Sequence, residues 1–154
     1  MQAQLDSRFL ALETFIKQCQ GKDVSEQIQS QLCRFGAVLV CGNVERCVEV
    51  ILLNRLNSRA HPRVLNFVKS HFQRGNNFDC AAIGQLLVRF DTDWYGHFVK
   101  FVETNPDVKE AIASCYAVRN SVSHGGTSSV GLKRLIELVA LSRRLIDGVV
   151  QATS

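Results

Sequence analysis

Residues 25–57 read SEQIQSQLCRFGAVLVCGNVERCVEVILLNRLN, and this stretch decides the fold class. Apolar side chains recur in it at intervals of three and four, the spacing that places them on one face of an α-helix. They are Ile28, Leu32, Phe35, Leu39, Val44, Cys47, Val48, Ile51 and Leu52. The spacing predicts one helix from about Ser25 to Asn57, in which Gly36 and Gly42 let a neighbouring element approach closely.

The same helical period continues on both sides of this segment. Four further groups share it: Leu5, Phe9, Leu12 and Ile16; Val64, Phe67, Val68 and Phe72; Ile83, Leu86, Leu87 and Phe90; and Trp94, Phe98, Phe101 and Val102. Pro62 suits the first turn of the helix that holds the second group, and Gly75-Asn76-Asn77 signals a turn after it. The sequence therefore predicts one helix before the long one and three after it, of which the helix around Ile83 is short.

A sixth helix is marked by residues typical of helix ends. Asn105 is the expected N-cap and Pro106 the expected first residue. The helix should run to about His124, because Gly125-Gly126 can end it there.

A seventh helix is expected from Val130 to about Val150, with Ser128 or Ser129 as its N-cap. The sequence contains no convincing strand pair, internal repeat or low-complexity segment. Helices with short connections predict an all-α fold, an up-and-down helical bundle with additional short helices. A length of 154 residues favours a single domain over residues 1–154, with a core large enough to be stable alone.

The composition is that of a mildly basic globular protein. The net charge is +4, and 46% of the residues are hydrophobic and 21% charged. This balance permits a polyanionic partner without establishing one. The N-terminus lacks a basic start followed by a long apolar stretch, so no signal peptide is expected. The longest apolar run, Ala37–Cys41, is too short to span a membrane, and a cytoplasmic protein without a membrane partner is expected.

The cysteines and most histidines give no metal-binding pattern. Cysteines stand at positions 19, 33, 41, 47, 80 and 115, with no C-x-x-C pair and no histidine at zinc-finger spacing. Reduced cysteines that pack as small hydrophobes are expected. His61, His71 and His97 lack acids or cysteines at ligand spacing, and surface or packing roles are expected for them. The sequence therefore predicts neither a metal nor a cofactor.

Residues 119–124 read Arg-Asn-Ser-Val-Ser-His and suit chemistry on a phosphodiester. Histidine exchanges protons near neutral pH, and arginine recognises and neutralises phosphate. An asparagine amide can orient either group by hydrogen bonding. Arg119, Asn120 and His124 are therefore the candidate catalytic residues for RNA cleavage.

The predicted sixth helix carries two stripes at 100° per residue. Val108, Ile112, Cys115 and Val122 form the stripe expected to face the core, and Arg119 lies in its middle. Ala113, Ala117, Asn120 and His124 form a second stripe on roughly the opposite side. Its two small residues would let another backbone come close. The helix is therefore expected to be covered on both sides, within one chain or by a symmetric dimer.

Arg119 allows two interpretations, and the sequence leaves both open. It can form a buried ion pair with an acid such as Glu45, while His124 serves as a helix cap. Alternatively it opens onto a cleft at a dimer interface, where it binds phosphate without a buried partner, and we favour this interpretation. On an ideal helix Arg119 and His124 diverge by about 140°, so one chain does not easily bring them together.

The segment from about Leu32 to Val150 resembles a HEPN domain, the helical higher-eukaryote and prokaryote nucleotide-binding family, and most of all its RiboL-PSP-HEPN clade. The family signature is an Arg, a polar residue, three further residues and a His, here Arg119, Asn120 and His124. Other matching segments are Ala117-Val118, His124-Gly125, Ser128-Ser129-Val130-Gly131-Leu132, Leu65-Asn66-Phe67-Val68 and Phe90-Asp91-Thr92-Asp93-Trp94. Asn43-Val44-Glu45-Arg46 resembles the acidic position in the clade's long helix.

The resemblance implies a metal-independent endoribonuclease, often the toxin of a toxin–antitoxin pair or a phage-defence component. Such domains act as homodimers, with an antitoxin or other companion as a possible partner. The 2′-oxygen of RNA would attack the adjacent phosphate, leaving a 2′,3′-cyclic phosphate and a 5′-hydroxyl. One His cannot readily both take and give a proton, whereas a two-fold axis supplies two His124 and two Arg119.

Two other functions are compatible with the sequence. One is a catalytically inactive HEPN scaffold that dimerises or binds nucleotide or RNA without cutting it, and the other is a helical adaptor without a nucleic-acid role. Two further features suit either RNA binding or a purely structural role. Base stacking is one possible role of Trp94, Phe98 and Phe101, but core packing fits their helical spacing better. Lys133, Arg134, Arg143 and Arg144 suit an RNA backbone or a solvated basic face.

Overall fold

Seven α-helices make up the regular structure of the chain in a computed structural model that describes residues 1–57, 59–72, 77–126 and 128–154. They are α1 (Gln2–Cys19), α2 (Glu26–Leu56), α3 (Pro62–Phe72), α4 (Cys80–Leu87), α5 (Thr92–Thr104), α6 (Pro106–Ser123) and α7 (Leu132–Ala152). No strand occurs in the described ranges. The predicted all-α bundle with additional short helices is confirmed.

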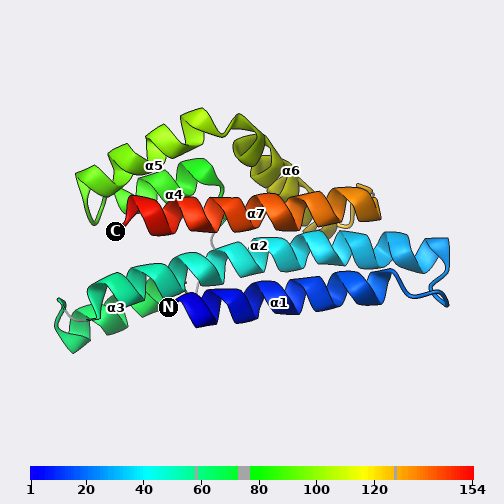
Figure 1. Cartoon of the computed structure of the whole chain (residues 1–154), viewed down its shortest axis with the longest axis horizontal. Coiled ribbons are helices and arrows are strands. Elements are labelled where there is room, and N and C mark those ends of the chain that lie inside the picture. The colour runs from blue at the N-terminus through cyan, green and yellow to red at the C-terminus, as the bar shows by residue number, and fades with distance from the viewer. Residues whose placement is uncertain (58, 73–76, 127) are drawn as a thin grey trace.

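The long helix α2 is the centre of the fold (Figure 1). It lies lengthwise between α1 and α7, and α6 also packs against it. Its N-terminus is set by Ser25, whose side-chain oxygen accepts a hydrogen bond from the amide of Ile28 at 3.4 Å. Because α2 contacts four other helices, most of its length is buried, and it positions residues from both halves of the sequence.

The predicted core face of α2 is correct only for its second half. Val44, Cys47, Val48, Ile51 and Leu52 are buried as expected. In the first half, Ile28 and Phe35 are 51% and 53% exposed, and the buried residues are the smaller Cys33, Ala37, Val40 and Cys41. Small side chains on this face let α6 and α7 approach closely, and the large apolar residues are displaced to the flank of the helix.

Gly36 and Gly42 have different surroundings. A Cβ at Gly36 would lie 2.6 Å from a methyl carbon of Leu135 on α7, so the close approach predicted there is confirmed. A Cβ at Gly42 would meet nothing within 4 Å, and the same prediction is wrong for that residue. Of these two glycines, Gly36 is therefore the one that lies at a close contact between α2 and α7.

The connections between α3, α4 and α5 use aspartate caps. Asp79 accepts from the amide of Ala82 at 2.8 Å to begin α4, and Asp91 accepts from the amide of Asp93 at 2.7 Å to begin α5. Phe90, expected within the fourth helix, lies beyond the end of α4 at Leu87. Of the predicted turn at 75–77, Gly75 and Asn76 lie outside the described residues, and Asn77 is in the loop before α4.

Asn105 is the N-cap residue of α6 and Pro106 its first residue, as predicted. The side chain of Asn105 nevertheless makes no capping bond, and its oxygen accepts from Arg144 at 2.6 Å. The cap predicted for the last helix is wrong. The helix α7 begins at Leu132 with Gly131 as its N-cap, so neither Ser128 nor Ser129 caps it.

All six cysteines are buried thiols outside any disulfide, as the sequence predicts. Burial raises the pKa of Cys47 and of Cys80 to about 11, which keeps both thiols protonated near neutral pH. Along the described ranges, no helix combines the length and apolar character needed to cross a membrane.

Candidate functional site

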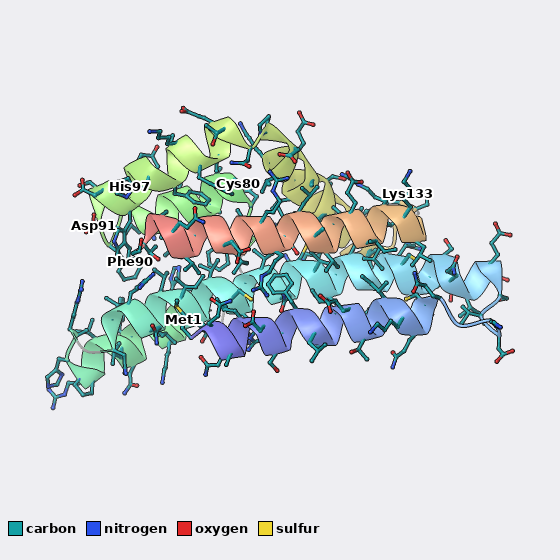
Figure 2. The ribbon with its side chains drawn as sticks, in the orientation of Figure 1. Met1, Cys80, Phe90, Asp91, His97 and Lys133 are labelled. Atoms are coloured by element: carbon teal, nitrogen blue, oxygen red, sulfur yellow. The ribbon has the colours of Figure 1, made fainter. Side chains whose placement is uncertain are left out.

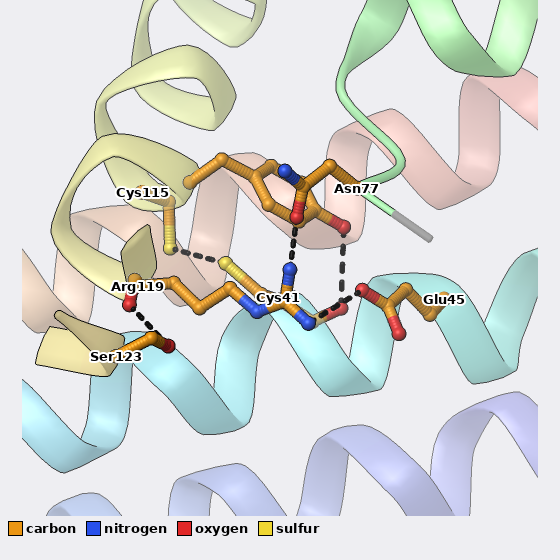
Figure 3. Close-up of polar contacts among 7 residues, drawn as sticks. Cys41, Glu45, Asn77, Cys115, Arg119 and Ser123 are labelled. Carbon is orange, nitrogen blue, oxygen red and sulfur yellow. Dashed lines mark hydrogen bonds and ion pairs between the residues drawn. The ribbon is translucent and has the colours of Figure 1, made fainter. Parts of the chain in front are cut away.

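Arg119 projects from α6 across to α2 (Figure 3). Its Nη2 lies 3.9 Å from Oε1 of Glu45 on α2, and its Nη1 donates a hydrogen bond to Oδ1 of Asn77 in the loop before α4. Two segments of the chain, 42 and 74 residues before Arg119 in the sequence, therefore fix the direction of its guanidinium. The side chain of Arg119 keeps 25% of its surface exposed.

A neutral layer lies one helical turn before this pair along both α2 and α6 (Figure 3). Cys41 precedes Glu45 by four residues, as Cys115 precedes Arg119, and the two sulfur atoms lie 3.5 Å apart. The hydroxyl of Tyr116 donates to the carbonyl of Cys41 at 3.4 Å. The hydrogen bond from Cys115 and burial raise the pKa of Cys41, and burial raises the pKa of Tyr116, so both stay uncharged. The layer supports Arg119 and supplies no nucleophile.

Glu45 is an incompletely satisfied partner for Arg119. Its Oε1 is buried without a hydrogen bond, since 3.9 Å to the guanidinium is an ion pair and not a hydrogen bond. Burial raises the pKa of this carboxyl, against the opposing effect of Arg119 and Arg46. The interpretation of Arg119 as a cation without an acidic partner is therefore wrong. The residue has both a partner and an exposed edge, and the guanidinium retains N–H groups that can bind an anion.

His124 lies at the end of α6, in a turn that the two following glycines shape. Gly125 has a φ of +72°, and the amide of Gly126 donates to the carbonyl of Ser121 at 2.7 Å. This is the Schellman arrangement of a helix C-terminus, in which His124 is the C-cap residue that follows Ser123. A Cβ at Gly126 would crowd the hydroxyl of Ser121 and lie 3.0 Å from its carbonyl oxygen, so glycine suits this tight turn.

Arg34 on α2 forms a hydrogen bond to this turn. Its Nη2 donates to the carbonyl of Gly126 at 2.5 Å, a contact between residues 92 apart in the sequence. Its Nε is buried without a hydrogen bond. Arg34 therefore helps to fix the position of the backbone just after His124.

The chain does not bring Arg119 and His124 together. Arg119 faces α2, whereas Asn120 and His124 are exposed, and neither of their side chains has a hydrogen bond or ion pair within the described residues. The expected bond from Asn120 to His124 is absent from this structure. One residue of the motif, Arg119, is held in place, and the other two are exposed.

The two stripes of α6 differ sharply in burial. Val108, Ile112 and Cys115 are buried as predicted, while Val122 is only half-buried. Every member of the second stripe is exposed, namely Ala113, Ala117, Asn120 and His124. A single chain therefore covers only one side of the helix. Of the two possibilities that the sequence leaves open, cover of both sides within one chain is wrong, and cover by a symmetric dimer stays a prediction.

Comparison with known families identifies the fold. The model of the RiboL-PSP-HEPN family matches residues 3–154. The chain belongs to this family. No curated protein and no solved structure gives a significant match. Membership groups the chain with HEPN-type ribonucleases and related nucleotide-binding domains, and the match includes α1, which lies before the segment whose resemblance the sequence displays.

The cations of α7 are already paired within the HEPN domain. Arg134 pairs with Glu137 at 2.8 Å, Arg143 with Asp6 at 2.5 Å, and Arg144 with Asp107 at 2.6 Å. Lys133 is exposed at the start of the helix (Figure 2). Three of these four basic residues form ion pairs with carboxylates. The solvated basic face therefore describes α7 better than a binding surface for an RNA backbone.

The remaining candidates have structural positions in the HEPN domain. Phe98 is buried, and Phe101 and Trp94 pack partly buried against the core, so they do not offer faces for base stacking. His97 is exposed on α5, away from Lys133 (Figure 2). Nδ1 of His61 accepts from the amide of Arg63 at 3.3 Å at the start of α3. No group of three or more metal-ligating side chains occurs among the described residues.

Sequence reasoning missed Asn77 and Arg34. Asn77 follows two residues with turn propensity and therefore reads as a turn residue, and nothing local links it to Arg119. Arg34 lies on the long helix as one of several cations. Only the packing of the α2–α6 pair identifies either residue as part of the site.

Proposed function

We propose that this HEPN chain is a metal-independent endoribonuclease. The observation that carries the proposal is the position of Arg119, held by Glu45 and Asn77 with an exposed edge, on the same helix end as the exposed His124. A preorganised cation and a proton-transfer group are what cleavage by an internal nucleophile requires. The substrate is RNA, because DNA lacks the 2′-oxygen that attacks.

In the proposed reaction the 2′-hydroxyl of a ribose loses its proton to a base, and its oxygen attacks the adjacent phosphorus. The bond from phosphorus to the 5′-oxygen breaks, and that oxygen receives a proton. The products are a 2′,3′-cyclic phosphate and a 5′-hydroxyl end. Arg119 stabilises the extra negative charge of the five-coordinate phosphorane, and His124 transfers a proton. Asn120 binds the phosphate or orients His124.

Two copies of the chain make the complete site in this proposal. A single imidazole cannot serve as base and acid in one concerted step, whereas a two-fold axis beside α6 brings two His124 and two Arg119 to one phosphate. The exposed stripe Ala113, Ala117, Asn120 and His124 supports this assembly, because small residues allow close helix contact. Glu45 and Asn77 then act as positioning residues for Arg119.

The biological role we propose is that of a toxin or phage-defence component acting on cytoplasmic RNA. Family membership supports it, and a companion protein such as an antitoxin would restrain the activity. The competing function is an inactive HEPN scaffold that dimerises or binds RNA or nucleotide. The intact motif with a fixed Arg119 favours the nuclease over the scaffold.

The end chemistry of RNA incubated with the pure protein tests the proposal. The nuclease leaves 2′,3′-cyclic phosphate and 5′-hydroxyl ends, and the same ends form in the presence of EDTA. The His124→Ala protein, prepared in parallel, controls for contaminating nucleases. Intact RNA would favour the scaffold, and activity that EDTA abolishes and magnesium restores would overturn the metal-independent mechanism.

A further inference from the structure

The stretch that contains α3 is the most one-sidedly charged part of the chain. No Asp or Glu occurs between Glu49 and Asp79, and five Arg or Lys residues do. Arg59, Arg63 and Lys69 are exposed, and none has a carboxylate or hydrogen-bond partner for its side chain within the described ranges. Unlike the arginines of α7, these cations remain available to a polyanion from outside the molecule.

An exposed aromatic ring lies in the middle of these cations. Phe67 is 76% exposed and Val64 is 48% exposed, both on the outer face of α3. Arg63 precedes Phe67 by four residues and His71 follows it by four, so the three share one stripe of the helix. Val68 and Phe72 hold the opposite face in the core. The ring is thus presented on a firmly packed helix with a cation one turn away.

A hollow connects this helix to the candidate site. It has a volume of about 340 Å³ and lies between the end of α3 and α4, with His71, Asn77, Gln85 and Arg89 among its lining residues. The rings of Phe72 and Phe78, 5.7 Å apart, form the junction. Asn77 borders the hollow and also accepts the hydrogen bond from Arg119. The outer stripe of α3, the hollow and Arg119 therefore form a continuous path.

We propose that this path binds single-stranded RNA on one side of the cleaved phosphate. A base beside the scissile bond enters the hollow, where Asn77, Gln85 and Arg89 offer hydrogen bonds, and a base further along stacks on Phe67. Arg59, Arg63 and Lys69 bind the phosphates. The strand is unpaired, because a ring can stack only on a base that is free of its duplex. The inference rests on the proposed nuclease function and extends it to the form of the substrate.

Binding to a non-cleavable strand tests this path separately from catalysis. The probe is a fluorescent single-stranded oligonucleotide of about twelve nucleotides with 2′-O-methyl groups at every ribose, measured by anisotropy. Phe67→Ala should weaken binding at least about fivefold, the loss expected for one stacked base, and Phe67→Trp should retain it. Arg63→Gln should lower the slope of log affinity against log salt by about 0.7, the value of one phosphate contact on a single strand.

Two matched variants serve as controls. Leu10→Ala removes a 59% exposed apolar side chain from α1, and Lys133→Gln removes an exposed cation from α7. Neither should change binding. Since Phe67 and Arg63 are exposed, thermal melts of their variants should match the wild type, which excludes misfolding as the cause.

The outcomes separate this inference from the nuclease proposal. RNA that stays intact, with oligonucleotide binding that still depends on Phe67, removes the nuclease and keeps the binding path. Normal cyclic-phosphate products with unchanged binding by Phe67→Ala and Arg63→Gln overturn the path and keep the nuclease. The proposed RNA path is also overturned if Phe67→Ala binds the oligonucleotide normally but no longer binds vesicles containing phosphatidylserine or an acidic protein that copurifies with the wild type. The exposed ring would then bind a membrane or a protein and not RNA.

Discussion

Arg119 and His124 stand five residues apart at one end of α6, yet the fold treats them differently. Arg119 contacts α2 and the loop before α4 and rests on a layer of buried thiols and a tyrosine. His124 is exposed, and only the backbone after it is anchored, through Arg34. One chain alone therefore completes the surroundings of the cation and leaves the imidazole facing outward.

The difference has a physical cause. A guanidinium close to a core is costly unless partners face it, so the interior must supply Glu45 and Asn77. An imidazole that shuttles protons needs access to substrate and to a second proton-transfer group. Leaving His124 on the surface of one chain meets that need if a second chain covers it. Stability should thus depend on Arg119 and hardly on His124, while activity should depend on both.

The largest effect is expected from the two alanine variants. Arg119→Ala and His124→Ala should each reduce cleavage by about 10²-fold or more, as for a lost charge stabiliser or acid–base group. Asn120→Ala should reduce it less. Initial rates on a defined single-stranded RNA measure this loss.

Thermal melts of the same proteins distinguish the two residues. Arg119→Ala should lose about 1–2 kcal/mol, since it leaves Glu45 unpaired at a partly exposed position, whereas His124→Ala should lie within about 0.5 kcal/mol of wild type. If Arg119→Ala loses far more stability, and cleavage only in proportion to unfolded protein, Arg119 is a structural residue and half of the proposed site disappears.

The next effect concerns the second chain. Ala117→Arg places a cation on the exposed stripe of α6, where a two-fold axis would bring it against its own copy. Sedimentation at micromolar concentration should show a wild-type dimer and an Ala117→Arg monomer, with cleavage lost together with the dimer. Ala140→Arg, at an exposed alanine on α7, should stay dimeric and active. A wild type that is strictly monomeric and cleaves RNA would contradict the two-chain site.

Much of the fold could be predicted from spacing, because helical periodicity and local end signals such as Pro62 and Pro106 act within a few residues. The five-residue spacing of Arg119 and His124 also predicts that their side chains point in different directions from the helix. The failures involve distant partners. The spacing of Ile28 and Phe35 predicts that they lie in the core, but both are exposed. Smaller residues on another face of α2 are buried instead, because they allow closer packing with α6 and α7. The side-chain oxygen of Asn105 accepts a hydrogen bond from Arg144 and makes no capping bond to its own helix.

A smaller effect is expected at Arg34. Arg34→Gln removes the bond to the carbonyl of Gly126, so the turn after His124 loses an anchor worth about 1 kcal/mol. Cleavage should fall less than tenfold, through kcat and not through KM, because the imidazole is less well positioned while RNA binding is unchanged. Arg34→Lys, which can still reach a carbonyl, should recover part of kcat. Arg46→Gln, at an exposed arginine on the same helix, is the control. A rise in KM with normal kcat would instead make Arg34 a binding residue.

The smallest effect is a pH dependence of stability at Glu45. Burial raises the pKa of this carboxyl in the folded protein above its ordinary value of 4.5, so between those two values the folded state holds a proton that the unfolded state has released. Stability due to this group therefore falls as pH rises through that window. Glu45→Gln has no such loss, so the melting temperature of the variant relative to wild type should rise between pH 4 and pH 7, by no more than about 3 °C. Glu137→Gln, which removes a carboxylate from an exposed pair on α7, controls for net charge. A relative melting temperature that instead falls across this range would mean that the attraction of Arg119 outweighs the burial of Glu45, and that the pair stabilises the fold.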